Sequence, residues 1–376
     1  MNQSGHRFLT KRKIPVAVPG VVLIFMNYKC TNMKAGLSFL FLIYFLSGSL
    51  VNGQSFSVDK VKFFNDTSVL NATITTNLSK MLGRKKEGEQ FGGTFVTTLQ
   101  GGISTNDPIM LEFRGHFRKD FCYLPPLKIN FKNGKDSGFS ALGSLKLVSE
   151  CKTYGEFDQD LLKEFLIYRI YNLLTDMSFR VRLLNLNFID SSGKKKAITE
   201  HAFLMEDLKD LAKRNNCHEW KDRKLFAADA DRKEMTIVGI FEYMIGNTDW
   251  GVAVNHNTRY IISKTDSLAR PFIVPYDFDY SGFVNTSYAI PDEKLGIENV
   301  RQRLYRGLPR TMEELNDVLD TFKKQKENIY TLISKFDLLT ANSKKEIVSY
   351  LDDFYSQINK PEMVKSIFIQ NAITNE

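Results

Sequence analysis

Three short polar segments in the second half of the chain carry the residues best suited to chemistry. Asp249 follows a predicted helix, Asn255 and Asn257 precede a predicted short strand, and Asp277 and Asp279 follow the next strand. Carboxylate and amide oxygens suit Mg²⁺, whereas Zn²⁺ sites use mainly His and Cys. The order helix, acid, amide, strand, strand, acid is also the order that a kinase-type phosphoryl-transfer site requires. These segments therefore predict a Mg²⁺ site beside Asp249, which would orient an attacking hydroxyl group.

The first half of the chain offers cations that could offset the charge of a triphosphate. Lys146 lies in a predicted strand and Glu164 in the long predicted helix that follows, a spacing that allows the ion pair with which kinases fix their phosphate-binding lysine. Lys128, in an earlier predicted strand, is the alternative for the same role. Arg114 begins a basic, glycine-containing turn that could contact phosphate oxygens. These four residues predict a phosphate-binding wall opposite the Mg²⁺ site.

The hydrophobic pattern divides the chain into a β-rich part and a mainly helical part. The predicted elements are short antiparallel strands between residues 58 and 148, one long helix over 159–174, a hairpin over 179–205, and then helices interrupted by two short strands at 258–263 and 272–276. A chain of this length exceeds what one hydrophobic centre usually organises. We therefore expect an α+β fold with two lobes, a β-rich lobe over 54–206 and a mainly helical lobe over 207–376.

With these motifs the chain resembles the spore-coat protein CotH-like kinases, atypical members of the protein-kinase-like fold. The resemblance covers residues 109–285, and it depends on Arg114-Gly115, on Gly246-Asn247-Thr248-Asp249-Trp250 with Asn257, and on Val274-Pro275-Tyr276-Asp277-Phe278-Asp279. It implies a two-lobed protein-kinase-like structure, with the long helix in the β-rich lobe, that binds ATP and Mg²⁺.

The resemblance also assigns roles to single residues. Asp249 corresponds to the catalytic-loop acid, and Asn257 and Asp277 to the metal ligands, with Asp279 as the alternative to Asp277. Asn257 follows Asp249 by eight residues, whereas the usual kinase loop has a separation of about five. The loop therefore either bulges or uses Asn255 as the ligand. Glu206, after the last strand of the β-rich lobe, falls at the hinge where adenine would meet backbone groups.

The N-terminal residues have the pattern of an export signal. Met33 and Lys34 precede an apolar run over 35–46 and a small-residue segment that ends at Gly53, which predicts a leader over 1–53 that is removed. Residues 1–32 are either a mis-assigned start or an extended first part of the leader. A retained N-terminal membrane anchor is the alternative, and no later segment reads as a transmembrane helix.

Removing the leader changes the charge and leaves three cysteines. Residues 1–53 hold no acid and six of the eight net positive charges, so the rest of the chain is only weakly basic and nucleic-acid binding is not expected. An oxidising compartment would allow one disulfide among Cys122, Cys151 and Cys217. We expect Cys122–Cys151, with three separate buried thiols as the alternative.

Two functions are compatible with this sequence. The first is an exported, periplasmic, cell-surface or secreted kinase-like protein that uses ATP and Mg²⁺ to phosphorylate a protein or another envelope-associated acceptor. The second is a non-catalytic cell-surface binding or scaffold protein with the same kinase-like fold, in which the acidic cluster holds Ca²⁺ or a ligand. Nucleotide binding that depends on Asp277 would favour the first function, and Ca²⁺ binding without nucleotide would favour the second.

Overall fold

Residues 57–372 are described by the computed structural model, except for residues 87, 100, 101, 103, 115–121, 132–137, 152–156, 222 and 223. The predicted leader, residues 1–53, lies outside the described residues. Gln54–Glu376 form one compact unit, and all elements named below belong to it.

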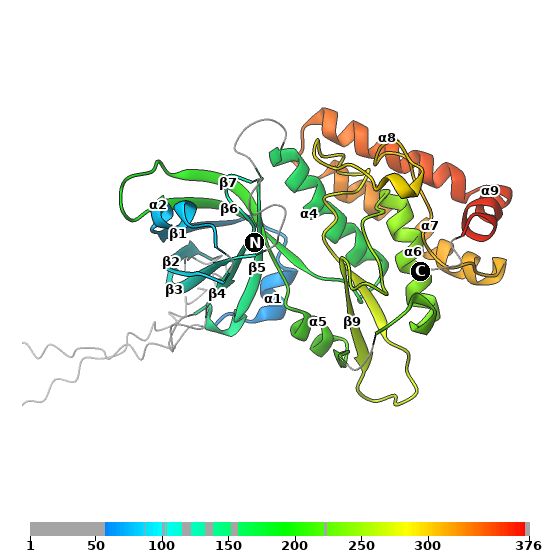
Figure 1. The fold of residues 1–376 in the computed structure, drawn as a ribbon, viewed down its shortest axis with the longest axis horizontal. Helices are drawn as coiled ribbons and strands as arrows, with labels where there is room; N and C mark the ends of the chain where they lie inside the picture. The colour runs from blue at the N-terminus through cyan, green and yellow to red at the C-terminus, as the bar shows by residue number, and fades with distance from the viewer. Residues whose placement is uncertain are drawn as a thin grey trace, which may run out of the picture. The chain divides into compact units, whose positions relative to one another are not determined.

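The first half of this unit is a closed β-barrel of seven strands (Figure 1). The strands are β1 (Leu70–Thr76), β2 (Gln90–Thr98), β3 (Ser104–Phe113), β4 (Leu127–Asn130), β5 (Ser144–Ser149), β6 (Val181–Asp190) and β7 (Ile198–Met205). Their order around the barrel is β1-β2-β3-β4-β5-β7-β6. Pairing between β6 and β1 closes the barrel. This pair is parallel, whereas all other neighbours are antiparallel. Two short helices, α1 (Lys60–Asn65) and α2 (Leu78–Gly83), flank β1.

Alternating hydrophobicity explains why these segments form a barrel with a filled interior. In β1, for example, Leu70, Ala72 and Ile74 are buried and the residues between them are more exposed, as expected for a strand with one face in a core. Phenylalanine rings fill much of the interior, and Phe95 and Phe131 meet edge-to-face with ring centroids 5.3 Å apart. The barrel is thus a packed core.

Helix α4 (Phe157–Leu174) lies between the barrel and the C-terminal helices (Figure 1). It contacts β6 and β7 on one side and α6 and α7 on the other. Buried residues are spread around its whole circumference, which is typical of a helix enclosed in a core. The other helices are α5 (Leu208–Arg214), α6 (Arg232–Ile245), α7 (Met312–Ser334), α8 (Ala341–Ile358) and α9 (Pro361–Lys365).

A small antiparallel sheet of three strands follows α5 and carries the polar segments of the second half. Its strands are β8 (Cys217–Glu219), β9 (Thr258–Ser263) and β10 (Phe272–Pro275), in the order β10-β9-β8. Helix α6 precedes β9 and ends at Gly246, which has the left-handed φ of +68° common at helix C-termini. Residues 247–257 connect this helix end to β9, and Pro275 at the end of β10 pairs with Thr258.

The prediction of a two-lobed protein-kinase-like fold is wrong. The predicted β-rich lobe is instead a closed barrel, because β1 pairs with β6 from Leu70–Leu184 to Thr76–Asp190. This pairing joins segments more than a hundred residues apart, and hydrophobic periodicity contains no information about such long-range partners. The barrel and the helices lie in one compact unit.

The cysteine prediction is confirmed in its pairing. Cys122 and Cys151 form a disulfide, and Cys217 is a buried free thiol. No helix within the described ranges is both long and apolar enough to cross a bilayer.

Candidate functional site

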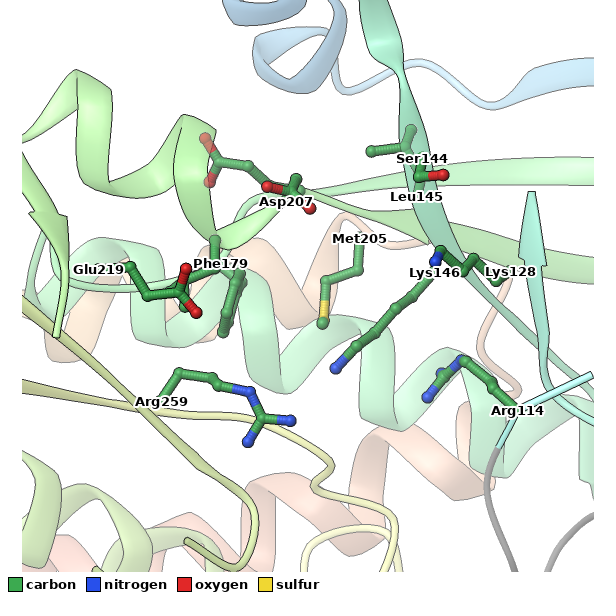
Figure 2. Close-up of a pocket in the computed structure, with 12 residues that line it drawn as sticks. Arg114, Lys128, Ser144, Leu145, Lys146, Phe179, Met205, Asp207, Glu219 and Arg259 are labelled. Atoms are coloured by element: carbon green, nitrogen blue, oxygen red, sulfur yellow. The ribbon is translucent and has the colours of Figure 1, made fainter. Parts of the chain in front are cut away.

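A cavity of about 310 Å³ lies where strands of the barrel face the small sheet (Figure 2). Arg114, Lys128 and Lys146 line it from the barrel, and Arg259 lines it from β9. Figure 2 shows the Lys146 and Arg114 side chains reaching toward the Arg259 guanidinium. Three acids, Glu206, Asp207 and Glu219, and the apolar side chains of Phe179 and Met205 complete the lining. The cavity therefore combines a basic wall with an acidic and apolar end.

Strand register brings the barrel cations together. Lys128 and Lys146 are direct neighbours in the β4–β5 pair, so both side chains leave the same face of the sheet. Arg114 follows β3, and its N–H donates to the carbonyl of Pro126 (3.0 Å), which extends the β3–β4 pairing. The structure thus gathers four of the five predicted cofactor-binding residues around one cavity: Arg114, Lys128, Lys146 and Glu206.

Lys146 occupies an unfavourable position for a cation. Burial, together with the charges of Arg114 and Arg259, lowers the pKa of Lys146 to about 7, while Asp277 and Asp207 act in the opposite direction. Its Nζ lies 3.8 Å from the centroid of the Tyr276 ring. An anion in the cavity would favour the charged form of this lysine, because an opposite charge nearby raises the pKa of a buried amine.

Glu164 does not take the predicted part in this arrangement. No ion pair joins it to Lys146 within the described part of the chain, where the Lys146 ammonium lies over Tyr276 instead. Glu164 is buried in α4 and lines a much smaller cavity of about 10 Å³. The orientation of Lys146 thus comes from the neighbouring ring, by a cation–π contact.

Glu206 borders the cavity but its carboxylate is engaged elsewhere. It accepts hydrogen bonds from Nε of Arg214 (3.0 Å) and from the N–H of Arg180 (3.1 Å). Its own N–H donates to the carbonyl of Arg180 (2.9 Å). The backbone N–H that we expected to meet adenine is therefore occupied, and Glu206 has a structural role at this edge.

Asp249 and Asn257 meet at the end of the β9–β10 hairpin. The Asn257 amide nitrogen donates to Oδ2 of Asp249 (3.0 Å) and to its carbonyl oxygen (2.7 Å). Nε2 of His256 lies 2.9 Å from Oδ1 of the same aspartate. Because the side-chain amide nitrogen is the donor in both contacts, the side-chain oxygen Oδ1 of Asn257 is left as the atom that could coordinate a metal.

Asp277 lies beside Asn257, as predicted. The N–H of Tyr276 donates to the backbone carbonyl of Asn257 (2.9 Å), which fixes the two segments side by side. Asp277 has a φ of +68°, which is rare for a residue other than glycine and is often found at functional sites. Its N–H donates to the buried hydroxyl of Tyr168 in α4 (2.9 Å), and its carboxylate accepts no hydrogen bond from the described residues.

The two alternative metal ligands lie elsewhere. Asn255 is exposed in the turn before β9, where its N–H donates to the carbonyl of Val252. Asp279 is buried and accepts a hydrogen bond from the Tyr288 hydroxyl (2.8 Å), and it lines the same small cavity as Glu164. The ligands that the structure brings together are therefore Asn257 and Asp277, with Asp249 next to them.

A buried acid that the sequence analysis missed lies beneath the Asp249 segment. Glu242 in α6 is 1 % exposed, and burial raises its pKa to about 8, against the lowering effect of Asn247 and Arg306. Asn247 in turn accepts a hydrogen bond from the N–H of Asp249 (3.0 Å). Its backbone carbonyl accepts a hydrogen bond from the N–H of Asn247 (2.8 Å), so Glu242 supports the loop through its backbone.

A second group of possible metal ligands consists of Glu150, Asp158 and His201. Their ligand atoms all lie within 4.8 Å of one another, and Nδ1 of His201 is 2.5 Å from Oδ1 of Asp158. Burial, together with Asp158, raises the pKa of Glu150 to about 7, and the hydrogen bond to Asp158 raises the pKa of His201. One imidazole with two carboxylates suits Zn²⁺ or Mn²⁺ better than Mg²⁺. This group is therefore separate from the predicted Mg²⁺ site.

Arg259, which lines the cavity, and Tyr276, which lies against it, are the main residues that sequence reasoning missed. The Arg259 guanidinium lies 4.6 Å from the centroid of the Tyr276 ring, to which Lys146 also lies close. Strand alternation could have indicated Arg259, because it is two residues after Asn257 and so lies on the same face of the strand. No sequence signal marks Tyr276 as the ring between two cations.

Comparison with known proteins gives no relative: no family model and no curated protein matches the chain. The resemblance to the CotH-like kinases therefore stays a prediction, and the function must be argued from the site.

Proposed function

We propose that this chain is an exported phosphotransferase that uses ATP and Mg²⁺ to phosphorylate a protein or another extracytoplasmic acceptor. One observation carries the proposal: four cations surround a cavity of about 310 Å³, and Asp277, whose charge acts on Lys146, lies beside the Asn257 and Asp249 pair. The proposal does not depend on a kinase-like fold, because similar chemistry recurs on unrelated folds when the site is alike.

The basic wall would bind the phosphate groups. Arg114, Lys146 and Arg259 repel one another across the cavity, as the lowered pKa of Lys146 indicates. A polyphosphate would replace this repulsion with charge-assisted hydrogen bonds, which are the strong ones in proteins. Phe179 and Met205, at the other end of the cavity, offer an apolar surface for the base.

Asn257 and Asp277 are the residues that would hold Mg²⁺. Both offer hard oxygen atoms, and the Asp277 carboxylate accepts no hydrogen bond from the described residues, which fits an ion that prefers oxygen ligands. When bound, the ion would offset the negative charge of the phosphate groups. Tyr168 keeps Asp277 in place through its backbone N–H.

Asp249 is suited to orient the acceptor hydroxyl. Its side chain is 39 % exposed, so a hydroxyl on a large molecule can reach it. Asn257 and His256 hold its two carboxylate oxygens, which fixes their direction while each keeps a lone pair for the incoming hydroxyl. The proton of that hydroxyl would pass to the Asp249 carboxylate.

Two features support export. The sequence predicts a leader over 1–53, and the Cys122–Cys151 disulfide belongs to an oxidising compartment. Such a compartment would have to supply the nucleotide.

Calorimetric titration of residues 54–376 with ATP and Mg²⁺ tests the binding step. We expect binding that falls at least about tenfold in Lys146→Met and that loses its Mg²⁺ dependence in Asp277→Ala. Transfer of labelled phosphate to a peptide library should vanish in Asp249→Asn, while nucleotide binding persists. Unchanged nucleotide binding in the Lys146 and Asp277 variants would refute the proposal.

A non-catalytic binding protein is the second candidate. Both carboxylate oxygens of Asp249 already accept contacts from neighbouring side chains, an arrangement that also suits a static ion site. Ca²⁺ binding that Asp277→Ala abolishes, without any nucleotide binding, would favour this function.

A further inference from the structure

A second cavity, of about 250 Å³, lies apart from the one proposed to bind nucleotide. Three arginines line it: Arg169 from α4, Arg180 just before β6, and Arg214 at the end of α5. Asp176 is the only acid among the described residues that line it, beside polar and apolar side chains of α1 and α4. This cavity is therefore strongly positive, and no local sequence pattern predicts that these three arginines meet.

The three guanidinium groups differ in how they are satisfied. Arg214 donates to Glu206, to the carbonyl of Asp176 (2.8 Å) and to that of Ser178. The side chains of Arg169 and Arg180, in contrast, make no hydrogen bond and no ion pair with any described residue. Two guanidinium groups thus line the cavity without a protein partner.

Arg180 is partly compensated by the charge of Glu206, which Arg214 already binds, whereas the surroundings of Arg169 are unfavourable. Burial lowers the pKa of Arg169, and the nearby charge of Arg182 lowers it further. The positive charge of Arg182 repels Arg169. Asp66 already forms an ion pair with Arg182 (2.8 Å), so this aspartate is not available to Arg169. A partly buried guanidinium without a partner is unfavourable, since arginines in such places are normally paired.

We propose that this cavity binds a phosphate group, either as inorganic phosphate or as the phosphate of a small monoester. Two guanidinium groups that make no hydrogen bond to the described residues match the charge of a dianion, and the planar donors of arginine fit phosphate oxygens in pairs. The volume of about 250 Å³ accommodates a phosphate with a short organic group. The site is independent of the proposed kinase activity, because none of its arginines lines the other cavity.

The test is calorimetric titration of the purified protein with inorganic phosphate, in the Lys146→Met background that weakens binding at the first cavity. We expect one remaining site, with affinity at least about tenfold weaker in Arg169→Gln and in Arg180→Gln. Arg84→Gln changes an exposed arginine and should have no effect. Glycerol phosphate in place of phosphate shows the source: tighter binding indicates a monoester.

Thermal unfolding separates binding from a structural role. Without phosphate, Arg169→Gln should be at least as stable as the parent, because it removes an uncompensated charge, yet it should lose the stabilisation that phosphate gives the parent. The proposal is overturned if the Lys146→Met protein binds no phosphate at millimolar concentration, or if both arginine variants bind it as tightly as the parent.

Discussion

The most informative single residue is Lys146, because its position is unfavourable for the fold and useful for a ligand. Its pKa of about 7 lies far below the ordinary value of 10.5. A lowered folded-state pKa means that between pH 7 and 10.5 the unfolded chain binds more protons than the folded chain. The stability contribution of this group is therefore present above pH 10.5 and lost as the pH falls through 7.

Replacing Lys146 with methionine should stabilise the protein and weaken its nucleotide binding. At pH 7 we expect a gain of about 1–3 kcal/mol in the free energy of unfolding, because the desolvated ammonium is removed, together with nucleotide binding that is at least about tenfold weaker. Urea unfolding from pH 6 to 10 measures the first effect, and the rise in stability with pH should be smaller in the variant. A destabilised Lys146→Met protein would show that the lysine is a structural residue. Lys128→Met, at an exposed neighbour in the sheet, is the matched control and should not stabilise.

The Glu150, Asp158 and His201 group predicts the opposite pH dependence. The folded-state pKa values of Glu150 and His201 are both raised, so their stabilising effect is complete below the unfolded values and is lost as the pH rises through the folded ones. Glu150→Gln should flatten the stability profile between pH 4.5 and 7. The expected change is on the order of 1 kcal/mol, since solvent reaches this group and screens it.

Urea unfolding at a series of pH values measures this change. Glu298→Gln, which removes an exposed carboxylate, is the control and should keep the parent profile. If the free energy of unfolding of Glu150→Gln depended on pH as steeply as that of the parent, the pKa of Glu150 would not be raised by its neighbours.

At the scale of elements, the junction between α6 and the Asp249 segment is the least tolerant of change. Gly246 ends the helix at a φ of +68°, and a Cβ at this position would lie 2.0 Å from the Tyr350 hydroxyl. Gly296 has nearly the same φ of +67°, but its Cβ would meet nothing within 4 Å. The two glycines therefore separate backbone strain from a steric clash.

Gly246→Ala should destabilise the protein by about 3 kcal/mol or more, and Gly296→Ala by about 1 kcal/mol. Both pay the strain of the left-handed conformation, and only the first forces Tyr350 to move. Urea unfolding gives both values. Tyr350→Phe should recover part of the loss in Gly246→Ala, because it removes the closest atom while the ring stays near. Equal losses for the two glycines would rule out the clash.

Most elements that carry the site could be predicted from local pattern. The helix expected over 159–174 is α4, Phe157–Leu174, and the two short strands expected at 258–263 and 272–276 are β9 and β10. Because β9 and β10 pair directly, the sequence order of Asn257 and Asp277 was enough to place them together. The predicted ion pair between Lys146 and Glu164 was wrong, because this contact depends on how a strand faces a helix. Spacing along the chain does not determine that orientation.

At the scale of the whole molecule, the prediction failed where distant segments meet. The barrel is closed by β1 and β6. The sequence pattern of each predicts a half-buried strand but does not indicate which strand it pairs with. The second cavity likewise joins arginines from α4, from the start of β6 and from α5. Neither arrangement leaves a local trace, so a plausible list of elements was assembled into the wrong fold.

The disulfide tests how strongly the long-range structure depends on a covalent link. Cys122 and Cys151 are separated by 29 residues and span the segment that holds β4 and β5, the strands that carry Lys128 and Lys146. Closing a loop of this length removes unfolded-state entropy worth about 3–4 kcal/mol. Replacing both cysteines with serine should lower the free energy of unfolding by roughly that amount, measured by urea unfolding without reductant.

Nucleotide binding by the surviving folded protein should weaken with the disulfide removed, because the two lysines lie within the linked segment. Cys217→Ala, at the buried free thiol, is the control. It should lower the free energy of unfolding by less than replacing Cys122 and Cys151 does, and reductant should still destabilise this variant. If reductant destabilises the parent no more than it destabilises the double serine variant, the link contributes nothing. Strand pairing with β3 and β7 alone would then hold the basic wall in place.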